Sequence, residues 1–177
     1  MHNRLFRVLA LAGLCASSFT LASVSAADAP TKTDQTFMTK AAGGGIYEVE
    51  VSKMAASKVK SAEVKAYAEM LVKDHTAANN ELKQLASSKG VVLPTDMPAD
   101  KKTMLDKLSK AKDIDREFVK QVGLDDHKTD IALFEKASKE AQDAEVKSWF
   151  GKTLPKLKDH RAGAEKLSRD VNTSMKP

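Results

Sequence analysis

The stretch VKAYAEMLVKDHTAANNELKQL, residues 64–85, decides the fold class. Its core-type side chains recur at steps of four and three, which is the spacing of one face of an α-helix. These positions are Val64, Ala68, Leu71, His75, Ala78, Leu82 and Leu85. A histidine on such a stripe needs a reason, because an imidazole is costly to bury without a partner. The stretch therefore predicts a buried helix face that carries a polar group.

Three further stretches have the same period. The stretch before a turn at residues 57–61 has Phe37, Ala41, Gly44, Glu48, Val51 and Ala55. The stretch at 113–141 has Ile114, Phe118, Gln121, Leu124, His127, Ile131 and Phe134. The stretch at 143–171 has Val146, Trp149, Thr153, Leu157, His160, Ala164, Leu167 and Val171. No segment shows the alternation of a strand or the turn signals of a hairpin.

Four long amphipathic helices predict an all-α fold, namely a four-helix bundle. Residues 90–112 connect helices two and three, and Pro98 is placed to start a short extra helix within this connection. Two topologies stay open, since the connection can cross over along the bundle or cap an up-down bundle. Pro155 lies inside the fourth helix, where it should kink the helix or leave a carbonyl free.

The first helix contains an unusual run of three glycines at positions 43–45. We expect this helix to begin after a cap at Thr33 or Asp34. Each glycine costs about 1 kcal/mol relative to alanine, so the run indicates a close helix approach or room for a site beside Glu48. In the alternative interpretation, the helix starts only at Ile46.

Residues 1–26 predict a cleaved export signal. Arg4 and Arg7 precede a mostly apolar segment that is too short for a comfortable membrane span, and Ala26 ends a small-residue cleavage pattern. Cys15 is the only cysteine and leaves with the signal, so the mature chain has no disulfide. We therefore expect a periplasmic or secreted protein without stable membrane insertion after cleavage.

The mature chain is long enough for one domain. We expect a flexible lead-in at residues 27–33 and a single helical bundle domain at residues 34–172. Without Arg4 and Arg7, the chain has 27 basic and 24 acidic side chains, a net charge of +3. These charges are interspersed and aromatic residues are few, which disfavours a nucleic-acid-binding surface.

Every histidine of the mature chain follows an aspartate. The pairs are Asp74-His75, Asp126-His127 and Asp159-His160. Each histidine lies on the core-facing stripe of its own helix, and the first helix places Glu48 on its stripe. Three imidazoles and one carboxylate from four helices can form a mononuclear site for a divalent transition metal ion such as zinc, copper, iron or manganese. The alternative is three separate structural histidines with local hydrogen bonds.

The level of each residue along the bundle constrains this metal site. At about 1.5 Å per residue, His127 and His160 differ in level by about 5 Å around a turn near position 142. Glu48 and His75 differ by about 8 Å around a turn near position 59, so Glu48 is the weakest member of the set. No histidine follows a glutamate by three residues, which disfavours an ordinary di-iron centre.

The three aspartates have a separate interpretation. Adjacent helical residues point about 100° apart, so the aspartate and histidine of one pair rarely share a ligand sphere. Asp74, Asp126 and Asp159 could instead accept the outer N–H group of a histidine on a neighbouring helix and fix its tautomer. In the alternative, they are exposed helix charges.

Several motifs along the chain match one known pattern. They are Phe37, Ala41-Ala42-Gly43-Gly44, Glu48-Val49 and Ala55, then Ala68-Glu69-Met70-Leu71 and Asp74-His75, then Val122, His127 and Phe134-Glu135, and finally Leu154-Pro155 and His160. This set, over residues 34–170, resembles the bacterial exported family Domain of Unknown Function 4142, which has a ferritin-like fold. The resemblance implies a periplasmic or secreted helical bundle, and its ferritin-like parentage implies metal. It implies no activity.

The sequence favours metal binding over catalysis. It contains no glycine-rich phosphate loop, no serine-centred elbow and no cysteine nucleophile, so no catalytic residue is predicted. We expect an exported bundle that binds a divalent transition metal ion through Glu48, His75, His127 and His160, in metal homeostasis or in oxidative or envelope stress. The alternative is a metal-free helical binding or envelope-stress protein whose histidines are structural.

Overall fold

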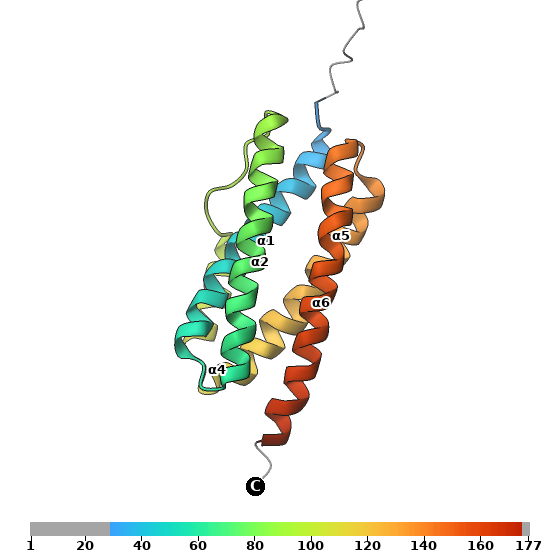
Figure 1. Ribbon diagram of the computed structural model, residues 1–177. Coiled ribbons are helices and arrows are strands. Elements are labelled where there is room, and N and C mark those ends of the chain that lie inside the picture. The colour runs from blue at the N-terminus through green and yellow to red at the C-terminus, as the bar shows by residue number, and fades with distance from the viewer. Residues whose placement is uncertain (1–28, 175–177) are drawn as a thin grey trace, which may run out of the picture.

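The computed structural model describes residues 29–174, with side chains as far as residue 170, so the predicted signal segment lies outside the described residues. The elements are α1 (Lys32–Lys58), α2 (Ala62–Ser88), α3 (Ala99–Ser109), α4 (Ile114–Phe118), the π-helix η1 (Val119–Asp126), α5 (His127–Glu140) and α6 (Ala144–Ser174). Within the described range there is no strand. The all-α expectation is confirmed, and Figure 1 shows the long helices side by side in one elongated bundle.

Contacts at the two ends of the bundle establish its topology. At one end, Asp34 near the start of α1 accepts hydrogen bonds from the backbone of the α5–α6 turn, and Lys89 after α2 pairs with Asp143 of that turn. At the other end, Asp115 of α4 accepts from the backbone N–H groups of the α1–α2 turn. The connection from α2 to α4 therefore returns along the length of the bundle (Figure 1), which is the crossover alternative.

The first helix begins slightly earlier than the sequence suggests. Its cap is Thr31, whose hydroxyl accepts from the Asp34 N–H while the Asp34 carboxylate accepts from the Thr31 N–H. This reciprocal pair is a capping box. The expected cap at Thr33 or Asp34 is therefore wrong, because Asp34 serves as the third residue of the box, and α1 takes in the end of the predicted lead-in.

Helix α1 runs through all three glycines, so the alternative start at Ile46 is wrong. Each glycine faces a different neighbour. A Cβ atom on Gly43 would meet the Pro98 ring at 3.0 Å, and one on Gly45 would lie 2.0 Å from the Asn79 Oδ1 atom. The close approach expected from the sequence is therefore present, and it brings a side chain of α2 against the α1 backbone.

The segment predicted as one long third helix contains the π-helix η1. A π-helix closes hydrogen bonds from residue i to i+5, so its turn is wider than an α-helical turn. Val122, Gly123 and Asp126 are buried in η1, whereas Gln121 and Leu124 are only partly buried. For this reason Gln121 is not a core position, and Leu124 only packs partly buried against the edge of the core.

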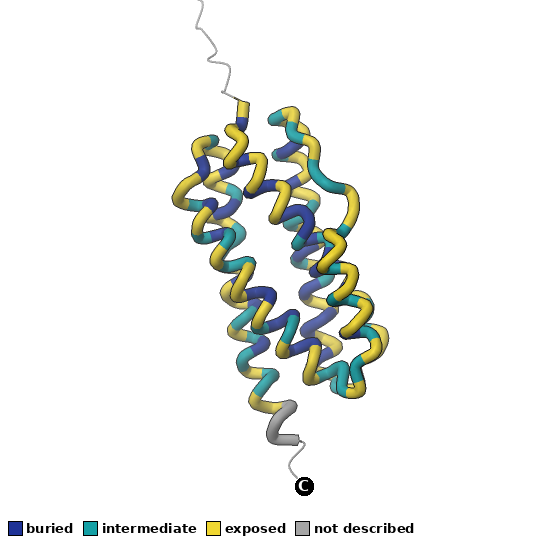
Figure 2. The backbone as a smooth tube through the Cα atoms, turned by 180° about the vertical axis from the view of Figure 1, so that it is seen from behind, coloured by how far each residue is buried: buried dark blue, intermediate teal, exposed yellow. Residues whose placement is uncertain are grey.

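The apolar core is divided into two clusters along the bundle. The cluster toward the α1–α2 turn contains Tyr47, Val51, Ala55, Val64, Tyr67, Ala68, Leu71, Leu108, Phe118, Val119, Val122 and Ala164. The cluster toward the α5–α6 turn contains Phe37, Met38, Ala41, Ala42, Leu82, Ala86, Phe134, Ala137, Ala141, Val146, Phe150 and Leu157. Figure 2 shows these buried positions along the inner sides of the helices. At the border between the clusters, α1, α2, α5 and α6 each contribute one polar residue.

Helix α6 continues through Pro155 without ending. None of the helices in the described range is long and apolar enough to span a membrane.

Candidate metal centre

The four polar residues at the border of the two clusters are the predicted ligands Glu48, His75, His127 and His160. Each histidine contributes one ring nitrogen to a group whose members lie within 4.8 Å of one another. The Glu48 carboxylate lies 4.0 Å from Nε2 of His75 and 4.0 Å from Nδ1 of His127. All four side chains belong to residues that are at most 6% exposed. The structure therefore brings the three predicted histidines together as one group and places Glu48 beside two of them.

Glu48 reaches the histidines because the helix bounds reduce the expected mismatch in level. Glu48 lies 10 residues before the end of α1, and His75 lies 13 residues after the start of α2. The difference of three residues corresponds to about 4.5 Å along the bundle, which a glutamate side chain can span. Glu48, the weakest member of the predicted set, therefore lies closer to the level of His75 than the sequence suggests.

Two of the histidines have fixed tautomers. The His127 Nδ1–H group donates to the Val122 carbonyl at 2.8 Å, and the His160 Nε2–H group donates to the Asp74 carboxylate at 2.9 Å. Both partners accept hydrogen bonds and cannot donate. When the rings are neutral, each inner nitrogen therefore carries a lone pair and no proton. These two inner nitrogens lie 3.2 Å apart.

This arrangement suits a shared cation. Two lone pairs that face each other in a dry interior repel unless a positive charge lies between them. Two ligand atoms at about 2.05 Å from a tetrahedral metal ion are about 3.3 Å apart, which is close to the observed separation of 3.2 Å between His127 Nε2 and His160 Nδ1. The donor set therefore fits a borderline divalent ion.

The other two members have no partners of their own. His75 Nε2 and both oxygens of Glu48 are buried, and no described residue forms a hydrogen bond with them. Buried polar atoms without partners are rare in folded proteins, and each one requires an explanation. A bound ion would give His75 Nε2 a partner, and the Glu48 carboxylate lies 4.0 Å from this nitrogen.

Burial controls the protonation of this centre. It lowers the pKa of His75 well below its usual value, with the neighbouring His127 and His160 adding to the effect. Burial also lowers the pKa of His127 to about 4, against the opposing bond to Val122. The pKa of Glu48 is raised by burial and by the nearby charges of Asp130 and Asp126. The imidazole rings of His75 and His127 are therefore neutral at pH 7, and neutral imidazole is the form that binds metal.

The three aspartates have three different environments. Asp74 on α2 accepts from His160 on α6, and Lys156 lies 3.6 Å away. Asp126 accepts from the Tyr47 hydroxyl at 3.1 Å and from Lys101 at 2.7 Å, so it contacts no histidine. Asp159 is exposed. The interhelical contact expected from the sequence thus occurs for Asp74, while the other two positions differ from that expectation.

Sequence reasoning missed two polar residues beside the centre. Asp130 lies one turn beyond His127 on α5, and Asn79 lies one turn beyond His75 on α2. Both line a small cavity together with His75. Their spacing of three and four residues from a histidine was a detectable signal, but polar residues at such spacings are common on solvated helix faces.

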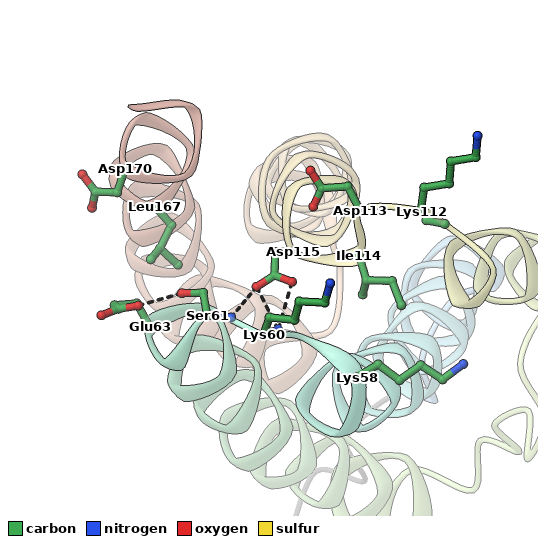
Figure 3. Close-up of a pocket in the computed structure, with 11 residues that line it drawn as sticks. Lys58, Lys60, Ser61, Glu63, Lys112, Asp113, Ile114, Asp115, Leu167 and Asp170 are labelled. Carbon is green, nitrogen blue, oxygen red and sulfur yellow. Dashed lines mark hydrogen bonds between the residues drawn. The ribbon is translucent and has the colours of Figure 1, made fainter. Parts of the chain in front are cut away.

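A larger hollow lies elsewhere in the described structure. It has a volume of about 640 Å³ and lies at the end of the bundle where the α1–α2 turn, α4 and the end of α6 meet. Figure 3 shows side chains of both charges there, with Asp115 bonded to the backbone of Lys60 and Ser61. None of the four predicted ligands lines this hollow.

A comparison of the sequence with protein-family models gives a match. The model of the family described as Domain of unknown function (DUF4142) matches residues 20–167. None of the curated proteins has a sequence that matches this chain.

Three solved structures have a similar fold. CopM in the Cu(II)-bound form has 18% sequence identity and a TM-score of 0.67, covering 78% of this chain and 97% of CopM. A DUF305 fragment from Deinococcus radiodurans has 12% identity and a TM-score of 0.68, with 79% and 98% covered. A putative spore coat protein from Bacillus halodurans has 12% identity and a TM-score of 0.65, with 84% and 93% covered. These identities are low, so the likeness concerns the fold.

Proposed function

This chain belongs to the family Domain of unknown function (DUF4142), and we propose that it binds one divalent transition metal ion between its four long helices. The ligands are Glu48, His75, His127 and His160. Asp74 orients His160 from outside the ligand set and fixes the tautomer in which Nδ1 faces the ion.

One observation carries this proposal. The outer nitrogens of His127 and His160 each donate to an acceptor, so their inner nitrogens face each other without a proton at 3.2 Å. A buried histidine with a purely structural role normally forms hydrogen bonds to protein partners through its ring nitrogens. Here the two inner nitrogens face each other, and beside His75 lies a Glu48 carboxylate that has no hydrogen-bond partner among the described residues.

Copper(II) is the first ion to test. Imidazole and carboxylate ligands suit zinc, copper, iron and manganese, and among divalent ions of this series copper(II) generally binds most tightly. The structural neighbour CopM was solved in a Cu(II)-bound form. These two facts favour copper without excluding zinc, iron or manganese as the ion bound in the cell.

The cellular role that we propose follows from export and metal binding together. The segment at residues 1–26 has the pattern of a cleaved signal, which would place the protein in the periplasm or outside the cell. A bundle that holds one transition metal ion there serves metal homeostasis or the response to oxidative or envelope stress. Comparison of growth between deletion and wild-type cells under excess copper or zinc tests this role.

Metal content tests the molecular proposal directly. Protein purified without a histidine tag should contain about one equivalent of a transition metal ion by elemental mass spectrometry, and titration should restore it after chelation. His127→Ala should abolish binding and the metal-dependent rise in melting temperature. Leu71→Ala, which removes a fully buried side chain one turn before His75, should lower stability and keep that rise.

The alternative function gives the opposite pattern. If the histidines are only structural, the wild type binds none of these ions, and His127→Ala and Leu71→Ala both lower stability whether metal is present or absent. That result would overturn the proposed metal site.

A further inference from the structure

A small pocket connects the partly exposed surface of the bundle with the candidate metal centre. We call it the Asp130 pocket. Its lining includes Gly45, His75, Asn79, Asp130, Trp149 and Thr153. Its volume of about 20 Å³ is room for about one water molecule or one ion that has lost most of its water. His75 is buried, whereas Asn79, Asp130, Trp149 and Thr153 are partly exposed.

Oxygen donors line this pocket beside the buried nitrogen ligands. Asp130 provides a carboxylate, Asn79 an amide oxygen and Thr153 a hydroxyl. Among the described residues, the Asp130 carboxylate forms no hydrogen bond and no ion pair, although the charge of Lys101 acts on it. Oxygen ligands hold a partly hydrated ion less tightly than imidazole holds a borderline transition metal.

The glycines of α1 make this arrangement possible. A side chain at Gly45 would collide with the Asn79 amide, and a Cβ atom on Gly44 would lie 3.7 Å from the Asp130 carboxylate. The bare backbone of α1 therefore leaves space for both oxygen donors next to the histidines. This accounts for glycines that cost stability in a helix interior.

Two nearby hollows have a different character. Both are lined by α1, α2 and Lys83. One also reaches Pro94 of the following connection, and the other contains Lys53 paired with Glu50. Neither includes any of the four proposed ligands. Lys83 places a positive charge in each of them, which disfavours the passage of a cation, whereas the Asp130 pocket has the Asp130 carboxylate and reaches His75.

We infer that the metal ion reaches the four ligands through the Asp130 pocket and that Asp130 captures it first as a transient oxygen ligand. This inference rests on the proposed function. Asp130 then acts on the rate of exchange and not on the final affinity. A group on the route lowers the barrier in both directions, so its loss slows binding and release together.

The single tryptophan of the chain, Trp149, lines the same pocket and provides the readout. Copper(II) quenches nearby tryptophan emission, so stopped-flow mixing of the metal-free protein with copper(II) glycinate gives the binding rate. Mixing of the copper-loaded protein with excess chelator gives the release rate. We expect Asp130→Asn to reduce the binding rate about tenfold, as expected for loss of a focusing charge. The release rate should fall by the same factor, because a transient ligand lowers a barrier that binding and release share, so the Kd should stay within twofold of wild type.

Two further variants keep the inference falsifiable. Asp159→Asn removes the same charge from an exposed position beside His160, outside the pocket, and should leave both rates unchanged. Ala78→Leu narrows the pocket while it leaves Asp130 in place, and should slow both rates again. Ala78 also lines the pocket and is partly exposed.

Three results would overturn the inference. Unchanged rates in Asp130→Asn and Ala78→Leu would show that the ion takes another route. A higher release rate with an unchanged binding rate in Asp130→Asn would make this carboxylate a resident ligand. Absence of copper(II) and zinc(II) binding in the wild type, measured by equilibrium dialysis, would overturn the metal site and the route together, which distinguishes that failure from the other two.

Discussion

Replacement of Glu48 by methionine should stabilise the metal-free protein and abolish metal binding. Both carboxylate oxygens are buried without a hydrogen-bond partner in the described structure, and a buried polar group in that state costs about 1–3 kcal/mol. Methionine is flexible, apolar and of similar length, so it can fill the same space. We expect the free energy of unfolding of the metal-free protein to rise by about 2 kcal/mol.

Metal should reverse this order of stability. A gain of about 2 kcal/mol raises the melting temperature of a domain of this size by about 4–8 °C. An ion present at one hundred times its Kd stabilises the wild type by about 2.7 kcal/mol and leaves Glu48→Met unchanged. Thermal unfolding followed by circular dichroism, with chelator and then with copper(II) or zinc(II), measures both effects on the same samples.

Ser52 provides a matched control. It lies one turn beyond Glu48 on α1, and its buried hydroxyl also has no hydrogen-bond partner among the described residues. Ser52→Ala should raise stability by about 1 kcal/mol and keep the full response to metal. The reasoning is refuted if Glu48→Met destabilises the metal-free protein by 1 kcal/mol or more, because the carboxylate would then stabilise the fold itself.

Three further predictions concern the surroundings of the centre. Asp74→Asn should weaken metal binding about 10- to 100-fold in a competition titration, whereas Asp159→Asn should change the Kd less than twofold. Gly123→Ala should destabilise the fold by about 2 kcal/mol, since its Cβ atom would lie 2.5 Å from a side chain of α6. A Cβ atom at Gly151 would have no neighbour closer than 3.8 Å, so Gly151→Ala should raise the free energy of unfolding by about 1 kcal/mol. Urea unfolding measures both variants. Burial raises the pKa of Asp34, but hydrogen bonds from the α5–α6 turn and from the helix cap outweigh this effect, so the pKa is lowered overall. Its stabilising effect, about 2 kcal/mol relative to Asp34→Asn at pH 7, is therefore fully present above pH 4 and should shrink as the pH falls below the usual pKa of 3.8.

The helices and their inward faces could be predicted from the sequence because both depend on local spacing. Residues three and four positions apart share one face of a helix wherever the helix lies. Among the described residues, the stripes that contain Glu48, His75 and His160 are buried or partly buried, as expected. The all-α fold and the short helix that begins after Pro98 follow from the same local rules.

The π-helix η1 could not be predicted in this way. Its wider turn changes which residues share a face, and it places Asp126 and His127 in the interior together. The prediction that Gln121 and Leu124 are core positions assumes a constant α-helical period. Gly123 packs directly against Ala164 of α6. The reason for a glycine at this position is visible only when the neighbouring helix is in place.

The sequence by itself determined that this protein is an all-α bundle and that one carboxylate and three imidazoles lie on inward faces of four helices. Only the tertiary structure decided how those groups meet. The contact between Asp74 and His160 spans two helices, and the Asp130 pocket needs side chains from α1, α2, α5 and α6. Helical periodicity fixes the direction of a side chain relative to its own axis, whereas the crossover topology and the rotation of each helix against its neighbours fix which side chains touch.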